Sequence, residues 1–574
     1  MFKKLLACTL LVISFGFTAF AQDIVQTRQY PKDYFRYPLD LPPSTAGSFG
    51  ELRPNHFHAG LDFRTNQRDG YPVHAAADGF VSRLKVQFGG FGNAVYITHP
   101  NGFTTVYGHL QSFSPELAKL VHDYQIQQKN DLVDFNLLPM QVPVTKGQVI
   151  ALSGHTGAVA GPHVHFEIRD TQTEQTINPQ LFGLTVRDDI PPVLGTACVY
   201  RFNDGPFNEK TQRQLLGVVG ASGHYRLANP AVIDVSGNTG FGITAYDMNN
   251  TSANHNGVYS IELKVDGKTV FTFSVERFAF DQTHAINALI DYPEFLESGR
   301  FIQKCFVLPG SRITLYPQSI NRGVVTFSDD SLHDVQYVVR DIAGNTSTLN
   351  LKVRSHSKII HPVELFKLPG TFFPYDKDNQ FSNDKVKVNI PVGNLYDSMN
   401  FTFTDLPKRP GAYSDTYQLG DRFDPINDTY DLWIKPDTTA PGWRADKAVI
   451  VNVDGDCIIG NYEDGYVKAK AKGFGGYYVK LDTEAPYIHP INITEDANMA
   501  GKHAIFVKIG DNLSGVKNYY GYIDGQWVLM YWDFKTKVLS YTFDDTIAHG
   551  KHTFKLDVTD QKDNTATFKA DFYK

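Results

Sequence analysis

The sequence predicts a mainly β protein, in which a compact domain with an antiparallel sheet is followed by several β-sandwich domains. Between residues 49 and 183, short apolar runs are bounded by Gly, Asn and Pro, as is typical of strands. After residue 183, turns rich in Asp, Asn and Thr alternate with strand-like stretches. A motif at 339–346 recurs at 558–565, which indicates two related β-domains. At 574 residues the chain is long enough for roughly three to four domains.

The N-terminus has the pattern of an export signal. Lys3 and Lys4 precede an apolar stretch from Leu5 to Phe20, which ends in the small-x-small sequence Ala19-Phe20-Ala21. We expect residues 1–21 to be cleaved near Ala21, leaving an N-terminal segment at 22–48 and a protein exported to the periplasm or cell envelope. No later run approaches the roughly 18–20 apolar residues of a membrane helix, so the mature chain is expected to have no transmembrane segment.

Charge and cysteine content exclude further classes. The formal net charge is -7 and the pI is about 6.2, so the chain lacks the basic surface that nucleic acid binding needs, and nucleic acid is not an expected partner. After loss of the signal, Cys198, Cys305 and Cys457 remain, too few for a disulfide framework. Cys198 and Cys305 either pair or remain as buried apolar residues, and the second reading is favoured.

Residues 49–185 are expected to form the first sheet domain. Its strand-like runs are Gly79–Val81, Ala94–Ile97, Thr104–Tyr107 and Gln148–Leu152. A helix at about 114–128 interrupts them, because Ser114 suits an N-cap, Pro115 suits the first helical position, and apolar residues follow at i, i+3, i+4 and i+7. Such an apolar stripe favours packing against the core over a lid on the groove.

The tail is divided by two Pro-containing joints, Asp189–Pro192 and Asp482–Pro486, which are typical of domain starts. We therefore predict β-domains at 186–355, 360–481 and 482–574. The first and last contain Asp-Gly pairs at 266–267 and 524–525, which favour type I′ hairpin turns. These two domains resemble bacterial immunoglobulin-like sandwiches, whereas the Tyr- and Gly-rich segment between them cannot be classified.

Three short clusters in the first domain contain imidazole groups and carry the chemistry: His56–Asp62, Tyr107–Leu110 and Gly161–Glu167. Histidine and aspartate are suitable zinc ligands, and a catalytic zinc site usually has three protein ligands and one open position. His58 and Asp62 can share a metal only if the chain turns between them, which Gly60 permits. His163 and His165 lie on one face of a strand, and spacing leaves open which of the two binds the metal.

The sequences HAGLD, YGHL and GPHVHFEI, in this order, with Gly79-Phe80-Val81 and Gly92-Asn93 between them, resemble the lysostaphin/LytM-type zinc endopeptidases over residues 49–183. The resemblance implies a small β-sheet domain with an open groove. It assigns zinc binding to His58, Asp62 and His165, catalytic roles to His109 and His163, and groove positions to Asn93 and Tyr107. The chain departs from the family at Gln111–Pro143, where the family usually has a short link, so the shape of the groove cannot be carried over.

The activity that this resemblance implies is hydrolysis of peptide bonds in peptidoglycan stem peptides or cross-links. Zinc would polarise the scissile carbonyl and activate a water molecule, while His109 and His163 share the proton transfers. One alternative is a non-catalytic activator of other wall hydrolases, which would predict damaged motifs, yet all five positions are intact. Another is an adhesive or structural surface protein dominated by its β-rich tail, in which no wall-binding motif is found.

Overall fold

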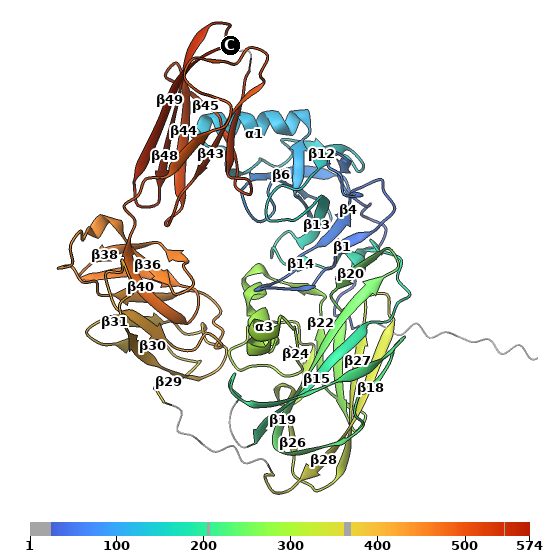
Figure 1. The fold of residues 1–574 in the computed structure, drawn as a ribbon. Helices are drawn as coiled ribbons and strands as arrows, with labels where there is room; N and C mark the ends of the chain where they lie inside the picture. Colours follow the sequence, from blue (N-terminus) through green and yellow to red (C-terminus); the bar gives the residue numbers. More distant parts are fainter. Residues whose placement is uncertain (1–24, 204–206, 361–368, 545) are drawn as a thin grey trace, which may run out of the picture.

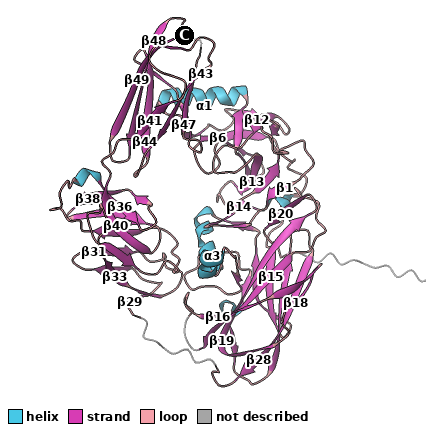
Figure 2. Ribbon diagram, viewed as in Figure 1, coloured by secondary structure: helices cyan, strands magenta, loops and turns pink. Residues whose placement is uncertain are grey.

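The computed structural model describes residues 25–203, 207–360, 369–544 and 546–574, and the expected export signal at 1–21 lies outside them. The fold is mainly β, as predicted, with strands predominating over a few helices (Figure 2). We use first, second, third and fourth domain for residues 25–185, 186–360, 369–481 and 482–574. Among the described residues, no helix has the length and apolar character needed to cross a membrane.

The first domain is built on a sheet in the order β1-β4-β13-β8-β7-β6-β10. These strands span Thr45–Gly47, Leu61–Arg64, His163–Asp170, Phe103–Gly108, Ala94–Thr98, Gly79–Val86 and Val133–Asn136, and the pairs between neighbours are antiparallel. A smaller sheet, β5-β12-β9, contains Pro72–His74, Val149–Ser153 and Leu110–Phe113. Both sheets contribute to one core, in which Val81, Val164 and Ile150 are almost completely buried.

The long insertion contributes the helix α1 (Pro115–Gln128) and the edge strand β10. Leu117 and Val121 are buried, as the apolar spacing predicts, and Pro115 begins the helix. Ser114 occupies the N-cap position, but its side chain makes no capping hydrogen bond. The helix therefore depends on packing more than on its cap.

The second domain is organised around the long strands β15 (Val193–Asn203), β19 (Val232–Asn249), β27 (Leu332–Arg340) and β28 (Thr346–His356), with the hairpin β21 (Ser260–Val265) and β22 (Lys268–Ser274). The predicted Asp-Gly turn is confirmed, because φ is 48° at Asp266 and 75° at Gly267. Cys198 and Cys305 are buried and free, so they do not pair.

The third domain has two sheets, β30-β31-β35-β39-β38 and β33-β34-β40-β36-β37, around its own core. Their strands span Asn379–Ser382, Val386–Ile390, Tyr430–Ile434, Tyr466–Ala471 and Gly460–Glu463 in the first, and Phe403–Leu406, Thr416–Leu419, Gly475–Leu481, Ala448–Asn452 and Cys457–Ile458 in the second.

The fourth domain is a sandwich of β41-β43-β47-β46 on β42-β49-β48-β44-β45. Its strands span Tyr487–Pro490, Ala504–Gly510, Val538–Thr542 and Tyr531–Asp533 in the first sheet, and Ala497–Asn498, Thr565–Tyr573, Lys551–Asp560, Val516–Ile523 and Gln526–Val528 in the second. Its Asp-Gly turn also has positive φ at both residues, 51° at Asp524 and 79° at Gly525.

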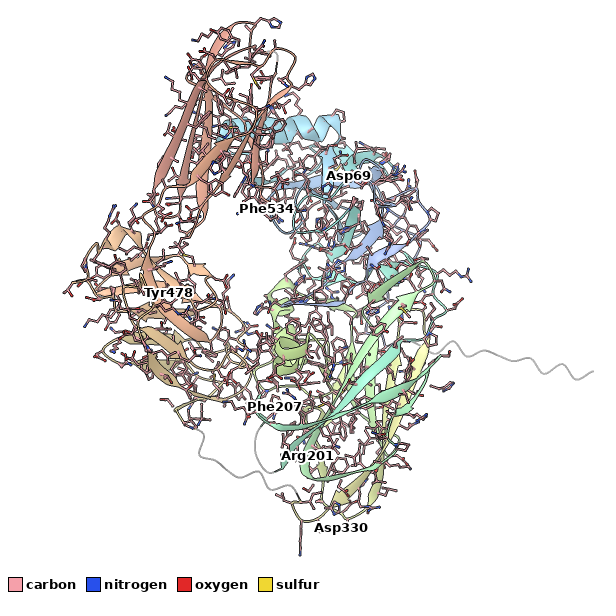
Figure 3. The ribbon with its side chains drawn as sticks, in the orientation of Figure 1. Asp69, Arg201, Phe207, Asp330, Tyr478 and Phe534 are labelled. Atoms are coloured by element: carbon pink, nitrogen blue, oxygen red, sulfur yellow. The ribbon has the colours of Figure 1, made fainter. Side chains whose placement is uncertain are left out.

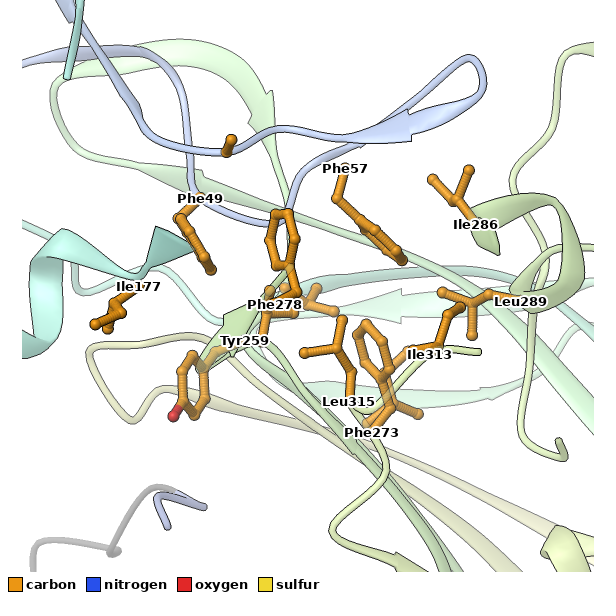
Figure 4. Packing of buried hydrophobic residues seen from close by; sticks show 14 of the residues in the cluster. Phe49, Phe57, Ile177, Tyr259, Phe273, Phe278, Ile286, Leu289, Ile313 and Leu315 are labelled. Atoms are coloured by element: carbon orange, nitrogen blue, oxygen red, sulfur yellow. The ribbon is translucent and has the colours of Figure 1, made fainter. Parts of the chain in front are cut away.

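The first and second domains share one continuous hydrophobic core. Phe49, Phe57 and Ile177 of the first domain pack with Phe278 and Tyr259 of the second (Figure 4). The sheet also crosses the boundary, since β14 (Thr176–Ile177) pairs with β23 (Arg277–Phe278). The sequence predicts separate domains here, but the core makes them one packed body.

The four domains form a closed ring, in which the fourth domain returns to the insertion of the first (Figure 1). The second domain contacts the third through the Gly310 amide and the Tyr396 carbonyl at 2.8 Å. The third contacts the fourth through the Gly460 carbonyl, which accepts from Lys562 Nζ at 2.9 Å. At the last contact, Phe534 of the fourth domain lies near Phe88 of the first, with ring centroids 6.3 Å apart (Figure 3).

Candidate metal centre

Strand pairing brings the predicted metal ligands together. In the antiparallel pair β4–β13, His165 lies directly opposite Asp62. His58 follows the short strand β3 (His56–Phe57), and the chain bends at Gly60 before β4 begins. All three side chains are buried, each with 3% of its surface exposed. The structure thus assembles His58, Asp62 and His165 into one group that could hold a metal ion.

Three donor atoms converge within this group. Asp62 Oδ1 lies 3.0 Å from His58 Nε2 and 2.8 Å from His165 Nδ1. The two histidine nitrogens are themselves 3.0 Å apart. Zinc bonds to nitrogen and oxygen are about 2.0–2.2 Å long, so donors close to 3 Å apart are near the spacing that one zinc ion requires. Two imidazole nitrogens and one carboxylate oxygen are also the donor types of catalytic zinc sites.

The opposite side of each ligand is held by a hydrogen bond. His58 Nδ1 donates to the Ser48 carbonyl at 2.7 Å, and His165 Nε2 donates to Glu167 Oε1 at 2.9 Å. Arg53 donates to Asp62 Oδ2 at 2.9 Å, which leaves Oδ1 directed at the two histidines. Such partners fix the ring orientation and direct the other ring nitrogen of each histidine at Asp62 Oδ1.

Burial and charge shift the pKa values of the three ligands in different directions. Burial lowers the pKa of His58, although Asp62 opposes this effect. For His165, burial acts to lower the pKa, but hydrogen bonds to Asp62 and Glu167 outweigh it and raise the value to about 9. Burial acts to raise the pKa of Asp62, whereas the charge of His58 and hydrogen bonds from the histidines hold it well below its usual range.

His109 and His163 lie beside this group. Their rings are 4.8 Å apart between centroids, and His163 Nε2 is 3.5 Å from Asp62 Oδ1. His109 Nδ1 donates to the Thr156 carbonyl and His163 Nδ1 donates to the Gly161 carbonyl, both at 2.9 Å. Each ring is thus held through Nδ1, and Nε2 of His163 faces Asp62 Oδ1. Burial, together with the neighbouring histidines, lowers the pKa of His109 to about 2.

The backbone at His109 and Gly60 explains how the site closes. His109 has φ of 61° at the junction of β8 and β9, a left-handed conformation that is uncommon for a residue with a Cβ atom. Gly60 does not have positive φ, but a Cβ atom there would lie 2.4 Å from the Phe166 carbonyl. The glycine therefore permits close approach of β4 to β13, in addition to the bend that the sequence suggests.

A cleft of about 950 Å³ opens at the site. Asp62 and His163 line it, together with Arg53, Arg64 and the loop Ala158–Pro162. The cleft therefore lies next to the converging donors.

The two expected groove residues are placed elsewhere. Tyr107 is completely buried, and its hydroxyl contacts Thr105 and the amide of Ala76, so it supports the core and does not line the groove. Asn93 lines a separate cavity, and its side-chain amide donates to the Leu110 carbonyl at 3.1 Å, next to His109. Asn93 is thus a positioning residue for the β8–β9 junction.

Several residues of the site escaped the sequence interpretation. Arg53 binds Asp62, Arg169 binds Glu167 at 2.6 Å, and Phe91 stacks on His165 with ring centroids 5.0 Å apart. Strand alternation after His165 could have indicated Glu167 and Arg169, because every second residue of β13 faces the same side. No local pattern marks Arg53 or Phe91.

Comparison with known proteins finds similarity over part of the first domain, including His58, Asp62 and His109. Residues 56–133 match the model of Peptidase family M23, and residues 370–482 match that of a Zu5-like domain. The chain is 34% identical over 145 residues to an "Uncharacterized metalloprotease" of Haemophilus influenzae, a match that covers 24% of this chain and 25% of that protein. It is 37% identical over 122 residues to the "DD-carboxypeptidase/endopeptidase Mpg" of Neisseria meningitidis, covering 21% of this chain and 22% of the relative.

A solved structure is also similar to part of the chain. A zinc containing peptidase from Vibrio cholerae has 29% identity and a TM-score of 0.18, over 24% of this chain and 37% of the other. The chain spans about a quarter of the length of the curated relatives named above. The match to the family model, together with the relatives named as metalloprotease and endopeptidase, shows that this chain carries a domain of Peptidase family M23.

Proposed function

We propose that the chain is an exported zinc-dependent endopeptidase that hydrolyses peptide bonds in peptidoglycan stem peptides or cross-links. The observation that carries the proposal is the convergence of His58 Nε2, Asp62 Oδ1 and His165 Nδ1 at one end of an open cleft, with two further histidines beside them. Relatives named as peptidoglycan DD-endopeptidases, including ShyC of Vibrio cholerae, support the substrate class.

The three donor atoms fit zinc, which when bound would polarise the scissile carbonyl and lower the pKa of a water molecule. Glu167 holds the His165 ring through its Nε2 proton, and Arg53 holds the second oxygen of Asp62. These contacts fix the donors before any metal arrives, so little reorganisation is needed on binding.

His109 and His163 are proposed to carry the proton transfers. Both rings donate through Nδ1 to backbone carbonyls, so Nε2 is the atom that accepts or returns a proton. With its pKa near 2, the metal-free His109 is neutral at physiological pH and can act as an acceptor. The two histidines share water activation, stabilisation of the oxyanion and protonation of the leaving amine.

The decisive experiment is incubation of the zinc-loaded mature chain with purified peptidoglycan, with and without a chelator, followed by mass spectrometry of the products. New peptide termini that require zinc are expected. Absence of such products would contradict the enzymatic proposal and favour a non-catalytic role in regulating other wall hydrolases.

Variants separate the proposed roles. Asp62→Ala should lose both zinc and turnover, because it removes a metal ligand. His163→Ala should retain the wild-type zinc content and lose about 10²–10⁴-fold in turnover, the usual range for a general acid or base. Zinc content is measured by elemental analysis. The control is His56→Ala, since His56 is exposed and its Nδ1 contacts the Pro54 carbonyl outside the metal group, and this variant should behave as wild type.

A further inference from the structure

Two groups of three aspartates lie at equivalent places in the second and fourth domains. Asp188, Asp247 and Asp341 form one group, and Asp482, Asp511 and Asp560 form the other. In each group one oxygen from every carboxylate lies within 4.8 Å of the others. None of these residues belongs to the M23 domain match.

The two groups share the same construction. Asn345 donates from its side chain to the Asp188 carbonyl at 3.3 Å and to Asp341 Oδ2 at 2.8 Å. Asn564 makes the corresponding bonds to the Asp482 carbonyl at 3.0 Å and to Asp560 Oδ2 at 2.6 Å. Asp341 and Asn345, like Asp560 and Asn564, belong to the motif that recurs at 339–346 and 558–565, so the repeat preserves part of a carboxylate cluster and not merely a turn.

Strand register confirms the equivalence of the remaining members. In the second domain Val193 pairs with Tyr246, which directly precedes Asp247. In the fourth domain Tyr487 pairs with Gly510, which directly precedes Asp511. The first aspartate of each group precedes its paired strand residue by the same interval in sequence. Asp247 and Asp511 thus enter their clusters at the same position relative to the paired strands.

Oxygen atoms in both clusters lack a partner. Asp247 has 5% and Asp482 has 1% of its surface exposed, yet Oδ1 of each makes no hydrogen bond. Asp511 Oδ1 is likewise buried without a partner. Among the residues that the structure describes, the ion pairs include no Lys, Arg or His bound to any of the six carboxylates. Grouped buried carboxylates with free oxygens are strongly unfavourable unless a cation or protons neutralise them.

In the first cluster, raised pKa values also show that the grouped carboxylates resist carrying their full negative charge without a neutralising partner. Burial, together with repulsion from Asp188 and Asp341, raises the pKa of Asp247 to about 9. Burial also raises the pKa of Asp341 to about 7. The side chain of Asn256, whose Oδ1 is buried and unpaired, lines the same small cavity as Asp188 and Asp247 and supplies a neutral oxygen.

We propose that each aspartate cluster binds one calcium ion. The donors are oxygens alone, which a hard cation prefers and which zinc sites with imidazole or thiolate ligands do not resemble. Carboxylate and amide oxygens in a flexible arrangement are the ligands that Ca²⁺ takes, whereas Mg²⁺ demands a near-ideal octahedron.

Both sites lie where one domain passes to the next. Asp188 belongs to the connection between the first domain and β15, and Asp482 to the connection between β40 and β41. Near the first site, Asn249 donates to Thr45 Oγ1 at 3.0 Å, and Thr45 belongs to β1, which pairs with the strand that carries Asp62. Calcium would therefore stiffen two joints of the ring, one of them beside the strands of the M23 site.

The test measures calcium bound to the full-length mature chain, loaded with zinc, by equilibrium dialysis against about 1 mM CaCl₂ and elemental analysis. The wild type should hold two calcium ions per chain, Asp247→Asn and Asp511→Asn one each, and the double variant none, with zinc content unchanged in all. Control variants are Asp189→Asn and Asp563→Asn, which change exposed neighbours outside the clusters and should retain both ions.

Thermal unfolding provides a second measurement that does not depend on stoichiometry. In calcium-depleted buffer the double variant should unfold at the same or a higher temperature than wild type, because Asn is nearly isosteric with Asp and brings no charge into the cluster. In CaCl₂ the order should reverse, because only the wild type gains from the ion. A wild type that binds no calcium at 1 mM, or a double variant whose unfolding temperature responds to calcium as the wild type does, would overturn the proposal.

Discussion

His165 connects two carboxylates through its two ring nitrogens, and this determines how the metal site responds to pH. Nδ1 faces Asp62 and Nε2 faces Glu167, which raises the pKa of the metal-free ring to about 9. At neutral pH the metal-free ring therefore carries a proton on Nδ1, the atom that must bind zinc. His58 has a lowered pKa and releases no proton.

We expect zinc affinity to rise with pH up to about 9, the pKa of His165. One proton is displaced per ion, so the association constant should increase about tenfold per pH unit below that value. Competition with a chromophoric chelator at pH 6, 7 and 8 measures this slope, after correction for the chelator's own titration. An affinity that does not change over this range would show that His165 is already neutral.

Glu167 is the second residue on which the site depends. It is completely buried between His165 and Arg169. Burial acts to raise its pKa, but the charges and hydrogen bonds of Arg169 and His165 together lower it. Glu167→Gln should weaken zinc binding by about 10–100-fold, because an amide accepts the Nε2 proton less strongly. Glu174→Gln is the matched control, since Glu174 also contacts Arg169 but is exposed. Equal affinities of the two variants, measured by chelator competition, would refute this role.

The sequence alone predicts the residues of the metal group but not the residues that hold them in place. Alternation on one strand places His163 and His165 on the same face, and the structure has them so on β13. Which of the two completes the metal group is a matter of register against β4, and register depends on the whole sheet. Arg53, Phe91 and Thr156 reach the site through contacts distant in sequence, which single-sequence patterns do not report.

At the scale of secondary structure, the approach of β4 to β13 depends on Gly60. Gly60→Ala should destabilise the chain by about 1–3 kcal/mol, because its Cβ would lie 2.4 Å from the Phe166 carbonyl. Zinc affinity should fall as well, since the displaced strand carries Asp62. Gly89→Ala is the control, because nothing lies within 4 Å of a Cβ atom there. Chemical denaturation and zinc titration of both variants test the prediction, and equal stability would contradict it.

Local elements were the easiest part of the fold to predict. The helix begins at Pro115 and ends at Gln128, and both Asp-Gly turns have positive φ, because spacing and turn chemistry are local properties. The sequence does not predict what that helix contacts in the folded molecule. Tyr531 of the fourth domain donates to Gln125 Oε1 at 3.2 Å, a partnership between residues far apart in the chain.

At the scale of the whole molecule, Asp131 secures the fourth domain to the first. It is buried, and its Oδ2 accepts from Tyr519 at 2.6 Å and from the Trp532 amide at 3.4 Å. Asp131→Ala leaves both donors without a partner and should release the fourth domain, seen as a larger radius of gyration in small-angle X-ray scattering. Asp134→Ala, which breaks part-exposed ion pairs with Arg83 and Lys85 within the first domain, should leave the radius unchanged. An unchanged radius in Asp131→Ala would show that other contacts suffice.

The boundary between the first and second domains illustrates what the sequence conceals. A Pro-containing joint predicts two separate units, but Phe49 and Phe278 pack with ring centroids 5.1 Å apart, and β14 pairs with β23 across the boundary. Apolar residues predict burial but do not show which residues pack together. A shared core and two separate cores therefore give similar sequence patterns.

The contact between Lys535 and the loop beside the cleft links movement of that loop to movement of the closed ring. Lys535 Nζ donates to the carbonyls of His155 at 2.8 Å and Val159 at 2.9 Å, and Val159 lines the cleft. In an open string of domains each hinge bends independently, but in a closed linkage no hinge can turn unless another turns or a contact opens. Under the proposed function, admission of a bulky, cross-linked polymer to this cleft would therefore be coupled to every hinge of the loop, and the weakest of its contacts would set how often the cleft widens.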